Sequence, residues 1–448
     1  MNSNYPNNQY GYNQQPFNQP QNQGFNNGYN PNFNNPNQFN QNSFNNNPYA
    51  QNAYSQNPYA QQNQFNQNPY QNPYVQQNQF NQNPYSVPPQ QNTAINYPQN
   101  QPVFNQGVFA QNINQNYYEY QQKLFRMFEQ KKDIKRYSLI FALAMLFTLV
   151  PSAIVSIILD AFGLMDFYYA NTTFSSSVGI FYSVLAIGLP FFVANRIIEK
   201  KSPQPQLSIY SAPKASLFKT IIIIFLSVFG CLAAMFSTGF ITSFFEGFGF
   251  TFSSGEDPVI NNAMDIVAMF VGTAVIPPLV EEFAMRHVVM QPLRKYGNSF
   301  AILASALAFG VFHGTPTQIP FAFLCGLFLG YAVIATESIW TGVIIHAIVN
   351  SLSCSYYTFL YFTDEDTADT LYYVVCLALL GVGLVSLIIY RILHKHEFKE
   401  IIGNKGLQDL SGKEKFSKFI FTPLMIIAII IFLIQAITMI SIDSGVQV

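Results

Sequence analysis

The chain has 448 residues, and only 10% of them are Asp, Glu, Lys or Arg, whereas an average soluble domain has about 25%. Hydrophobic residues make up 49%, and the formal net charge is −1, so the charge balance indicates no nucleic-acid partner and no strongly acidic one. The composition excludes an ordinary soluble domain for most of the chain and predicts a membrane protein.

Residues 1–118 contain no charged side chain and consist mostly of Asn, Gln, Pro, Tyr and Phe. The sequence QQNQFNQNPY occurs at 61–70 and again at 76–85. This tract has too few aliphatic residues to offset the entropy that ordering its backbone would cost, so we predict a disordered, low-complexity tail. Polar residues interleaved with aromatic ones are typical of self-associating segments. The alternative is a solvated tether without a specific partner.

Apolar segments follow one another from Tyr137 onward, and most have the ~20 residues that a membrane-spanning helix needs. The segment at 299–313 is short and needs support from its neighbours, so the prediction is eight or nine transmembrane helices. The nine segments are 137–159, 178–195, 220–244, 264–290, 299–313, 318–335, 339–360, 371–393 and 418–441.

The 21 basic residues can all be placed on one side of the membrane. They cluster at 123–136, 196–219, 286–295 and 391–418. With a cytoplasmic N-terminus and nine spans, every cluster lies on or beside the cytoplasmic side, where Lys and Arg are enriched. The loops on the opposite side contain none; they lie near 160–177, 245–263, 314–317 and 361–370. The prediction is an integral multi-pass membrane protein with a cytoplasmic N-terminal tail and an outside C-terminus.

Glu281 and Glu282 begin the first of three polar motifs in otherwise apolar segments, a Glu-Glu-x-x-x-Arg sequence that ends at Arg286. Ionised side chains at membrane depth are costly, so they persist mainly where they face a cavity or pair with one another. Glu282 and Arg286 are one helical turn apart and can pair, whereas Glu281 lies about 100° around the axis. Pro277 and Pro278 precede the motif, and the bend that proline causes would open space and leave carbonyl groups without donors. The alternative is a structural ion pair with Glu281 at the cytoplasmic interface.

Two histidine motifs follow on later segments, Phe309-x-x-x-His313 and His346-x-x-x-Asn350. The residues of each motif are one helical turn apart and share a face. A single histidine in an apolar helix is more often a hydrogen-bonded core residue than a catalyst, so a functional interpretation requires the motifs to meet. Close helix approach at glycines would bring Glu281, His313 and His346 to one cavity, provided that the helix at 299–313 is short or re-entrant. The glycines lie at positions 310, 314, 326 and 330.

The motifs EExxxR, FxxxH and HxxxN, in this order on successive membrane segments, resemble the signature of the CAAX protease and bacteriocin-processing family (CPBP or Abi). This family includes the type II CAAX prenyl endopeptidases. The resemblance covers about 264–355 and implies a four-helix catalytic core within an all-α polytopic membrane protein. The predicted organisation is a low-complexity tail at 1–118, a basic cytoplasmic segment with three accessory helices at 119–263, the catalytic core at 264–360, and two C-terminal helices at 361–448.

The resemblance implies a role for each motif residue in peptide hydrolysis. Glu281 would be the general base, and His313 would help it to activate a water molecule. His346 and Asn350 would stabilise the tetrahedral oxyanion, for which imidazole and amide groups are suitable donors. The other two residues of the first motif, Glu282 and Arg286, would support Glu281 structurally.

The sequence is compatible with both a metal-dependent and a metal-free mechanism. The family is commonly labelled as metalloprotease, and Glu281, His313 and His346 are candidate ligands because two histidines and a glutamate hold zinc in many catalytic sites. Zinc or another divalent metal would suit this set. A metal-free glutamate mechanism is slightly preferred, since Asn350, one turn from His346, makes better sense as a hydrogen-bond donor.

The sequence therefore predicts an intramembrane endopeptidase that hydrolyses a peptide bond near the cytoplasmic half of the bilayer. Its partners would be membrane lipid and a membrane-associated protein or peptide, in a CAAX-type or a bacteriocin-immunity-like role. A non-catalytic membrane scaffold or immunity protein could keep the same fold. A proton-coupled transporter could use the same buried acids and histidines as a relay, although the duplication between halves that is common in transporters is not evident.

Deletion of residues 1–118 is expected to leave proteolysis intact, because the tail lies outside the segment that carries the motifs. Peptide cleavage by the shortened and the full-length chains, purified in detergent and compared at equal concentration, checks this. Loss of cleavage on deletion would show that the tail and the catalytic core are functionally coupled.

Overall fold

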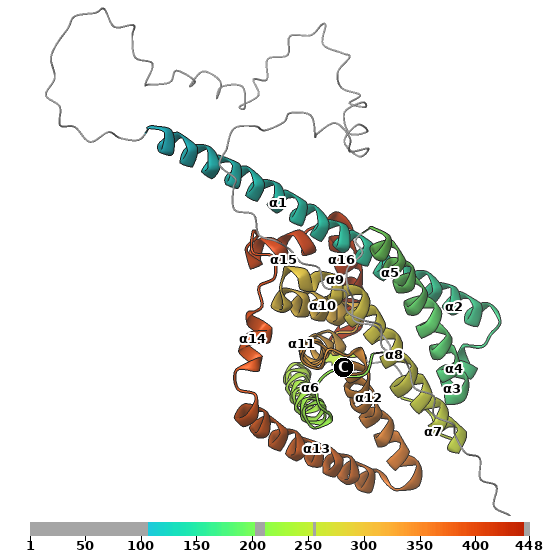
Figure 1. Ribbon diagram of the computed structural model, residues 1–448. Helices are drawn as coiled ribbons and strands as arrows, with labels where there is room; N and C mark the ends of the chain where they lie inside the picture. The colour runs from blue at the N-terminus through green and yellow to red at the C-terminus, as the bar shows by residue number, and fades with distance from the viewer. Residues whose placement is uncertain (1–105, 202–210, 254–256, 443–448) are drawn as a thin grey trace, which may run out of the picture. The chain divides into compact units, whose positions relative to one another are not determined.

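The computed structural model describes residues 106–201, 211–253 and 257–442, with side chains from Tyr117 onward (Figure 1). This part of the chain is helical apart from two short strands and the connecting turns. Most of the predicted tail, residues 1–105, lies outside the described residues, so its disorder and self-association stay predictions. Its last part, residues 106–118, is also predicted to be disordered but is helical, as the first turns of α1.

The elements before the first polar motif are α1 (Gln106–Phe147), α2 (Leu149–Ala161), α3 (Met165–Ala170), α4 (Thr172–Tyr182), the π-helical turn η2 (Ser183–Gly188), α5 (Leu189–Lys201), α6 (Leu217–Glu246) and strand β1 (Phe250–Phe252). The motif segment forms α7 (Ala263–Met269), π-helical η3 (Phe270–Val275), α8 (Ile276–Glu282), π-helical η4 (Phe283–Met290), α9 (Gln291–Leu293), the 3₁₀ turn η5 (Arg294–Tyr296), α10 (Asn298–Phe312), α11 (Gln318–Thr336) and α12 (Ile339–Phe362). The C-terminal elements are α13 (Glu365–Leu393), α14 (Glu397–Gly403), α15 (Gly412–Ile420), α16 (Pro423–Thr438) and strand β2 (Ile440–Ile442).

Seven helical segments among the described residues are long and apolar enough to cross a membrane. The pair α15 and α16, bent by 71° at its break, supplies an eighth, and the shorter apolar helix α10 corresponds to the ninth predicted segment. Each predicted segment thus coincides with an apolar helix. The predicted all-α polytopic fold is confirmed.

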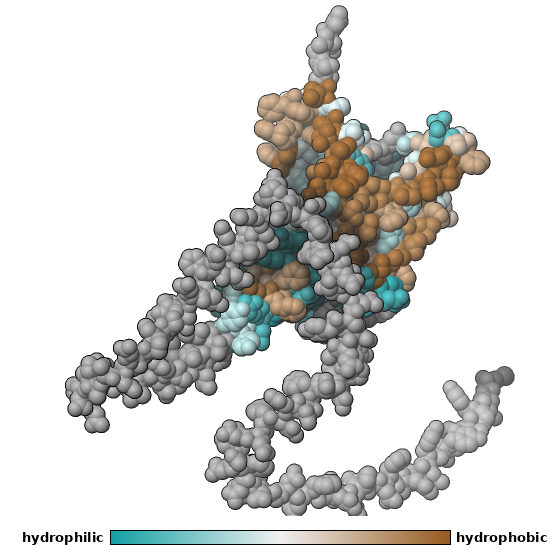
Figure 2. Space-filling view, turned by 90° about the horizontal axis from the view of Figure 1, so that it is seen from above, coloured by the Kyte–Doolittle hydropathy of each residue, from teal (hydrophilic) through white to brown (hydrophobic). Residues whose placement is uncertain are grey.

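Large hydrophobic side chains cover much of the surface of the helical body. Figure 2 shows them over a broad face, with polar side chains mainly at its margins. Ile157, Phe240, Leu377 and Ile434, for example, are all exposed on four different helices. Contact of such a large apolar surface with water is unfavourable, whereas contact with lipid tails is not, because the tails are as apolar as these side chains. The chain is a multi-pass membrane protein.

The loops that carry the basic residues contact one another at one set of helix ends, called the basic side here. Lys295 Nζ lies 3.1 Å from Asp133 Oδ2, which joins the end of the motif segment to α1. Lys415 Nζ donates to the Tyr296 carbonyl at 2.6 Å, which brings α15 to the same place. The basic side comprises residues 126–136, 211–219, 294–298, 336–338 and 394–415.

The loop between α11 and α12 has no basic residue of its own, yet it also lies on the basic side. The Lys214 amide donates to the Thr336 carbonyl at 3.0 Å, and Lys214 Nζ lies 2.6 Å from Glu337 Oε2. The hydrogen bond from Lys214 holds the pKa of the Glu337 carboxyl below its usual range. These contacts put the loop on the side that the nine-helix arrangement requires.

The opposite helix ends, called the non-basic side here, meet in a second set of contacts. Tyr357 Oη donates to Asp257 Oδ1 at 2.5 Å, and Thr172 Oγ1 donates to the Val259 carbonyl at 2.7 Å. Strand β1 pairs antiparallel with β2, so the C-terminal strand lies beside the loop that follows α6. The non-basic side comprises the helix ends and loops at 161–172, 247–253, 257–262, 314–317, 357–366 and 439–442.

Glycines allow α10 and α11 to approach closely, as predicted. A Cβ on Gly310 would lie 2.8 Å from the Ile319 carbonyl oxygen, and one on Gly326 would lie 2.9 Å from Ala306 Cα. Both distances are too short for an ordinary contact, so no larger residue fits without movement of a backbone. Gly314, at φ +62°, reverses the chain between the two helices in a conformation that favours glycine. The end of α10 is thereby held against α11.

Gly326→Ala is expected to destabilise the fold by about 1–3 kcal/mol, because the added methyl group would displace the α10 backbone at Ala306. Thermal unfolding of the full chain in detergent should show a lower midpoint. Gly381→Ala in α13 is the matched control: a Cβ there meets no atom within 4 Å, and alanine is the better helix former. Equal midpoints for the two variants would contradict the close packing.

Candidate active site

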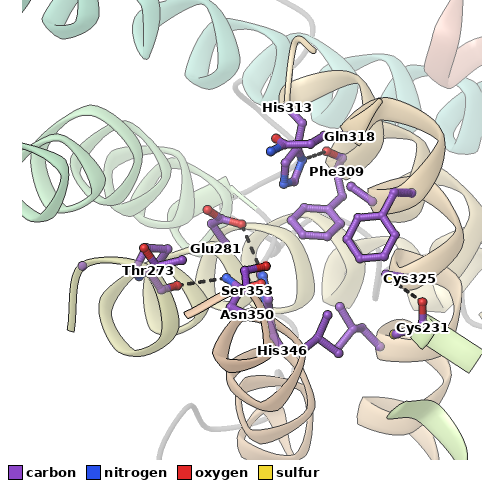
Figure 3. A pocket seen from close by; sticks show the side chains of 16 residues that line it. Cys231, Thr273, Glu281, Phe309, His313, Gln318, Cys325, His346, Asn350 and Ser353 are labelled. Atoms are coloured by element: carbon purple, nitrogen blue, oxygen red, sulfur yellow. Dashed lines mark hydrogen bonds and ion pairs between the residues drawn. The ribbon is translucent and has the colours of Figure 1, made fainter. Parts of the chain in front are cut away.

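The three polar motifs meet at a cavity of about 320 Å³ within the helical body (Figure 3). Glu281 reaches the cavity from α8, and Phe309 and His313 reach it from the end of α10. His346 and Asn350 complete the wall from α12. The structure thus brings together residues that are up to 69 positions apart in the sequence.

Glu282 and Arg286 form an ion pair behind the cavity wall. Arg286 Nε lies 3.1 Å from Glu282 Oε2, and both side chains are 0% exposed. The guanidinium also lies over the Phe309 ring, with Cζ 4.6 Å from the ring centroid. Burial of two charges is unfavourable unless each has a close partner, and the contact with the aromatic face adds attraction. The pair therefore ties the first motif to the second.

His346 lies between the two glutamates. Its Nδ1 is 3.1 Å from Glu282 Oε1, and its Nε2 is 3.9 Å from Glu281 Oε2. A carboxylate can only accept, so Nδ1–H donates to Glu282, and this bond fixes the orientation of the ring. Glu282, expected to support Glu281, contacts Arg286 through one oxygen and His346 through the other. Nε2 is left facing Glu281 and the cavity (Figure 3).

His313 lies at the C-terminal end of α10, and its ring is oriented by the backbone. Nδ1 lies 2.7 Å from the Phe309 carbonyl oxygen, to which it donates. In a neutral ring this leaves Nε2 as an acceptor. The Phe309 ring makes edge contacts with both imidazoles, with centroids 4.7 Å from His313 and 5.6 Å from His346. Phe309 therefore acts as an apolar spacer between the two histidines.

The short length of α10 explains how His313 reaches the cavity. The helix has 15 residues, which span about 22 Å, less than the hydrocarbon thickness of about 30 Å. His313 therefore ends its helix at the depth of Glu281 rather than at the membrane surface. This is the short helix that convergence of the motifs required.

Asn350 bonds to a carbonyl that two prolines leave without a donor. Asn350 Nδ2 donates to the Thr273 carbonyl at 2.9 Å. The residues four and five positions after Thr273 are Pro277 and Pro278, which have no N–H, so neither an α-helical nor a π-helical bond can satisfy this oxygen. The expected free carbonyl therefore exists, and it holds Asn350 at the cavity. An amide has two N–H groups, so one remains for another acceptor.

The candidate metal ligands Glu281, His313 and His346 all line the cavity. Among the described residues, however, no three His, Cys, Asp or Glu side chains are arranged to hold a metal ion. Nδ1 of His313 bonds to the Phe309 carbonyl and Nδ1 of His346 bonds to Glu282, which leaves Nε2 of both rings available as a ligand. In this conformation, however, the His₂Glu donor set considered from the sequence is not gathered around one point that a metal ion could occupy.

Three further polar residues line the cavity that the motifs did not indicate: Thr273, Gln318 and Ser353. Gln318 is the first residue of α11, close to His313 in Figure 3. Ser353 lies one turn beyond Asn350 on α12 and continues the polar face that His346 begins. That continued spacing was the only sequence signal for it, whereas a polar residue at a helix start, such as Gln318, is too common to indicate a site.

Arg286→Ala is expected to destabilise the protein by about 3–5 kcal/mol, because the variant leaves the Glu282 carboxylate buried without its cation. Thermal or denaturant unfolding in detergent measures the loss. Lys214→Ala is the matched control, since it breaks an ion pair with Glu337 in which the two side chains are 68% and 44% exposed; such pairs contribute less than about 1 kcal/mol. Similar losses in both variants would show that the buried pair has no special structural role.

Comparison with known proteins finds similarity in the same segment that carries the polar motifs. Residues 263–352 match the family model described as type II CAAX prenyl endopeptidase Rce1-like. No curated protein and no solved structure matches the chain. The matched segment runs from the start of α7 into α12 and contains all three polar motifs. This segment of the chain is therefore similar to the Rce1-like type II CAAX prenyl endopeptidases.

Proposed function

We propose that the chain is an intramembrane endopeptidase that cleaves a membrane-associated protein or peptide, with Glu281 as general base. The observation that carries this proposal is the state of Glu281 Oε2. This oxygen is buried at the cavity, and none of the described residues donates a hydrogen bond to it. A buried carboxylate oxygen without a donor is a natural partner for a water molecule.

The attacking water would lie between Glu281 and His313. It can donate one hydrogen to the Glu281 carboxylate and the other to Nε2 of His313, which is free to accept because Nδ1 bonds to the Phe309 carbonyl. Its lone pair would then face the substrate carbonyl carbon. Proximity and orientation of this kind supply much of the rate enhancement of a hydrolase. Glu281 takes the proton as the new C–O bond forms.

The oxyanion that results would be stabilised from α12. Asn350 has one N–H group left after its bond to Thr273. His346 would donate from Nε2 when both ring nitrogens carry a proton, with its ring held in place by the contact between Nδ1 and Glu282. Donors that are already oriented stabilise developing negative charge effectively. When the C–N bond breaks, protonated Glu281 returns its proton to the leaving amine, so the cycle is balanced.

The main competing function is a membrane scaffold that keeps the fold without catalysis. It would need the buried Glu282–Arg286 pair for stability, but it would have no use for a Glu281 carboxylate oxygen that lacks a donor and lies at the cavity beside two oriented imidazoles. The two functions therefore differ in their tolerance of change at Glu281.

Glu281→Gln is expected to lower peptide cleavage by about 10²–10⁴-fold while the fold persists, because the amide cannot accept the proton of water. The measurement is a proteomic comparison of membrane peptides in cells that carry the wild-type chain or the variant at matched expression. A precursor should accumulate only with Glu281→Gln. Glu246→Gln is the control, since Glu246 is exposed at the end of α6. Identical peptide profiles for all three chains would favour the scaffold.

A further inference from the structure

A second cavity of about 620 Å³ adjoins the candidate active site. The two cavities share four lining residues, Gly272, Thr273, Gln318 and Ser353. These four residues, called the neck here, lie between the two cavities. The second cavity, called the vestibule here, is therefore adjacent to the active site on the far side of the neck.

The vestibule opens on the non-basic side. Its outer wall includes Tyr168 and Tyr169 in α3, Thr172 at the start of α4, Asp257 before α7, and Tyr357 near the end of α12. The basic clusters lie at the other ends of the helical segments that continue from α4, α7 and α12. The vestibule thus leads away from the basic loops.

The path from the active site toward the basic side is closed by packing. Glu282 and Arg286 are 0% exposed, and so is Ile345, next to His346. A Cβ on Gly342, one turn nearer the basic side than His346, would lie 2.7 Å from Glu282 Oε2. Among the cavity-lining residues of α12, exposure increases in the other direction, from His346 at 6% through the half-buried Asn350 to the exposed Ser353.

The walls of the vestibule suit a polar peptide rather than a lipid chain. They carry hydroxyl groups on α3, α4, η3 and α12, the Gln318 amide and one carboxylate, Asp257, and the described lining includes no Lys or Arg. An extended peptide has unpaired backbone N–H and C=O groups that such side chains can satisfy. The hydroxyls of Thr172 and Tyr357 already donate to groups of the protein, but an isoprenoid chain would displace water from the Gln318 amide and the Ser353 hydroxyl in the neck, which is unfavourable.

We propose that the substrate is a hydrophilic, unlipidated peptide segment that enters from the non-basic side, through the vestibule and the neck. This inference rests on the proposed function, because it names the substrate class and entry side of that same site. By the positive-inside rule, the non-basic side is the non-cytoplasmic one. The proposal therefore favours an external or translocated peptide over a prenylated protein that approaches from the cytoplasm.

The entry side can be tested by thiol labelling of the full-length chain in membrane vesicles. Ser353→Cys places a reporter of almost the same size in the neck. The native Cys231, Cys325 and Cys354 are buried but line the two cavities, so the wild-type chain measures their reaction as the background. Lys214→Cys is the matched reporter for the basic side. The probe is a membrane-impermeant maleimide, applied to right-side-out and to inside-out vesicles.

Ser353→Cys should react in the vesicles in which Lys214→Cys is protected, and the converse should hold for Lys214→Cys. Reaction of both variants from the same face would overturn the proposal, and so would a Ser353→Cys thiol that reacts from neither face but reacts after denaturation in detergent. Serine to cysteine is a small change, so misfolding is not expected to obscure the result.

Cleavage in detergent, where both faces are accessible, separates this inference from the proposed function. The probe is a mixture of quenched fluorescent, unlipidated peptides. The maleimide should reduce cleavage by Ser353→Cys to the level of Glu281→Gln, and labelled Lys214→Cys should keep its activity. Cleavage that survives labelling of Ser353→Cys would overturn the entry route and leave the peptidase intact. If Ser353→Cys and Lys214→Cys react from opposite faces but no chain cleaves the peptides, the entry side would stand and the proposed peptidase activity would be refuted.

Discussion

The buried carboxylate of Glu282 is the interaction on which the site depends. It contacts Arg286 through one oxygen and His346 through the other, with 0% exposure. Because a buried charge without partners is very costly, α8 and α12 can pack only in the register that brings these groups together. Gly342 makes room for this contact, since any side chain there would collide with Glu282. A single carboxylate thus links stability to the orientation of an imidazole in the cavity.

The backbone around the site is irregular for identifiable reasons. The two prolines of α8 remove both donors that Thr273 would use, and the Asn350 side chain replaces them. Helix α10 ends early, so His313 is held by its own helix terminus. Irregular backbone at membrane depth is tolerated where other groups of the protein satisfy it. Here each irregularity also orients a side chain toward the cavity.

Much of this could be predicted from the sequence, because charged, histidine and glycine residues are conspicuous in apolar segments. The apolar helices, the Glu282–Arg286 pair and the glycine contacts of α10 and α11 all followed from such patterns. The contact between Glu282 and His346 did not, since it depends on how α12 is rotated against α8. The vestibule was also missed, because it is built from ordinary hydroxyl and amide residues at helix ends.

The short helices have a consequence for the surrounding lipid. Helix α16 has only 16 residues, about 24 Å of length, and isoleucines such as Ile430, Ile434 and Ile437 are exposed on it. A bilayer of ordinary thickness would therefore exceed the apolar height of the protein along this edge. Hydrophobic mismatch of this kind costs fractions of a kcal/mol per Å, and it is relieved when the bilayer thins locally. Bilayer thickness thus becomes a variable that acts on the stability of the fold.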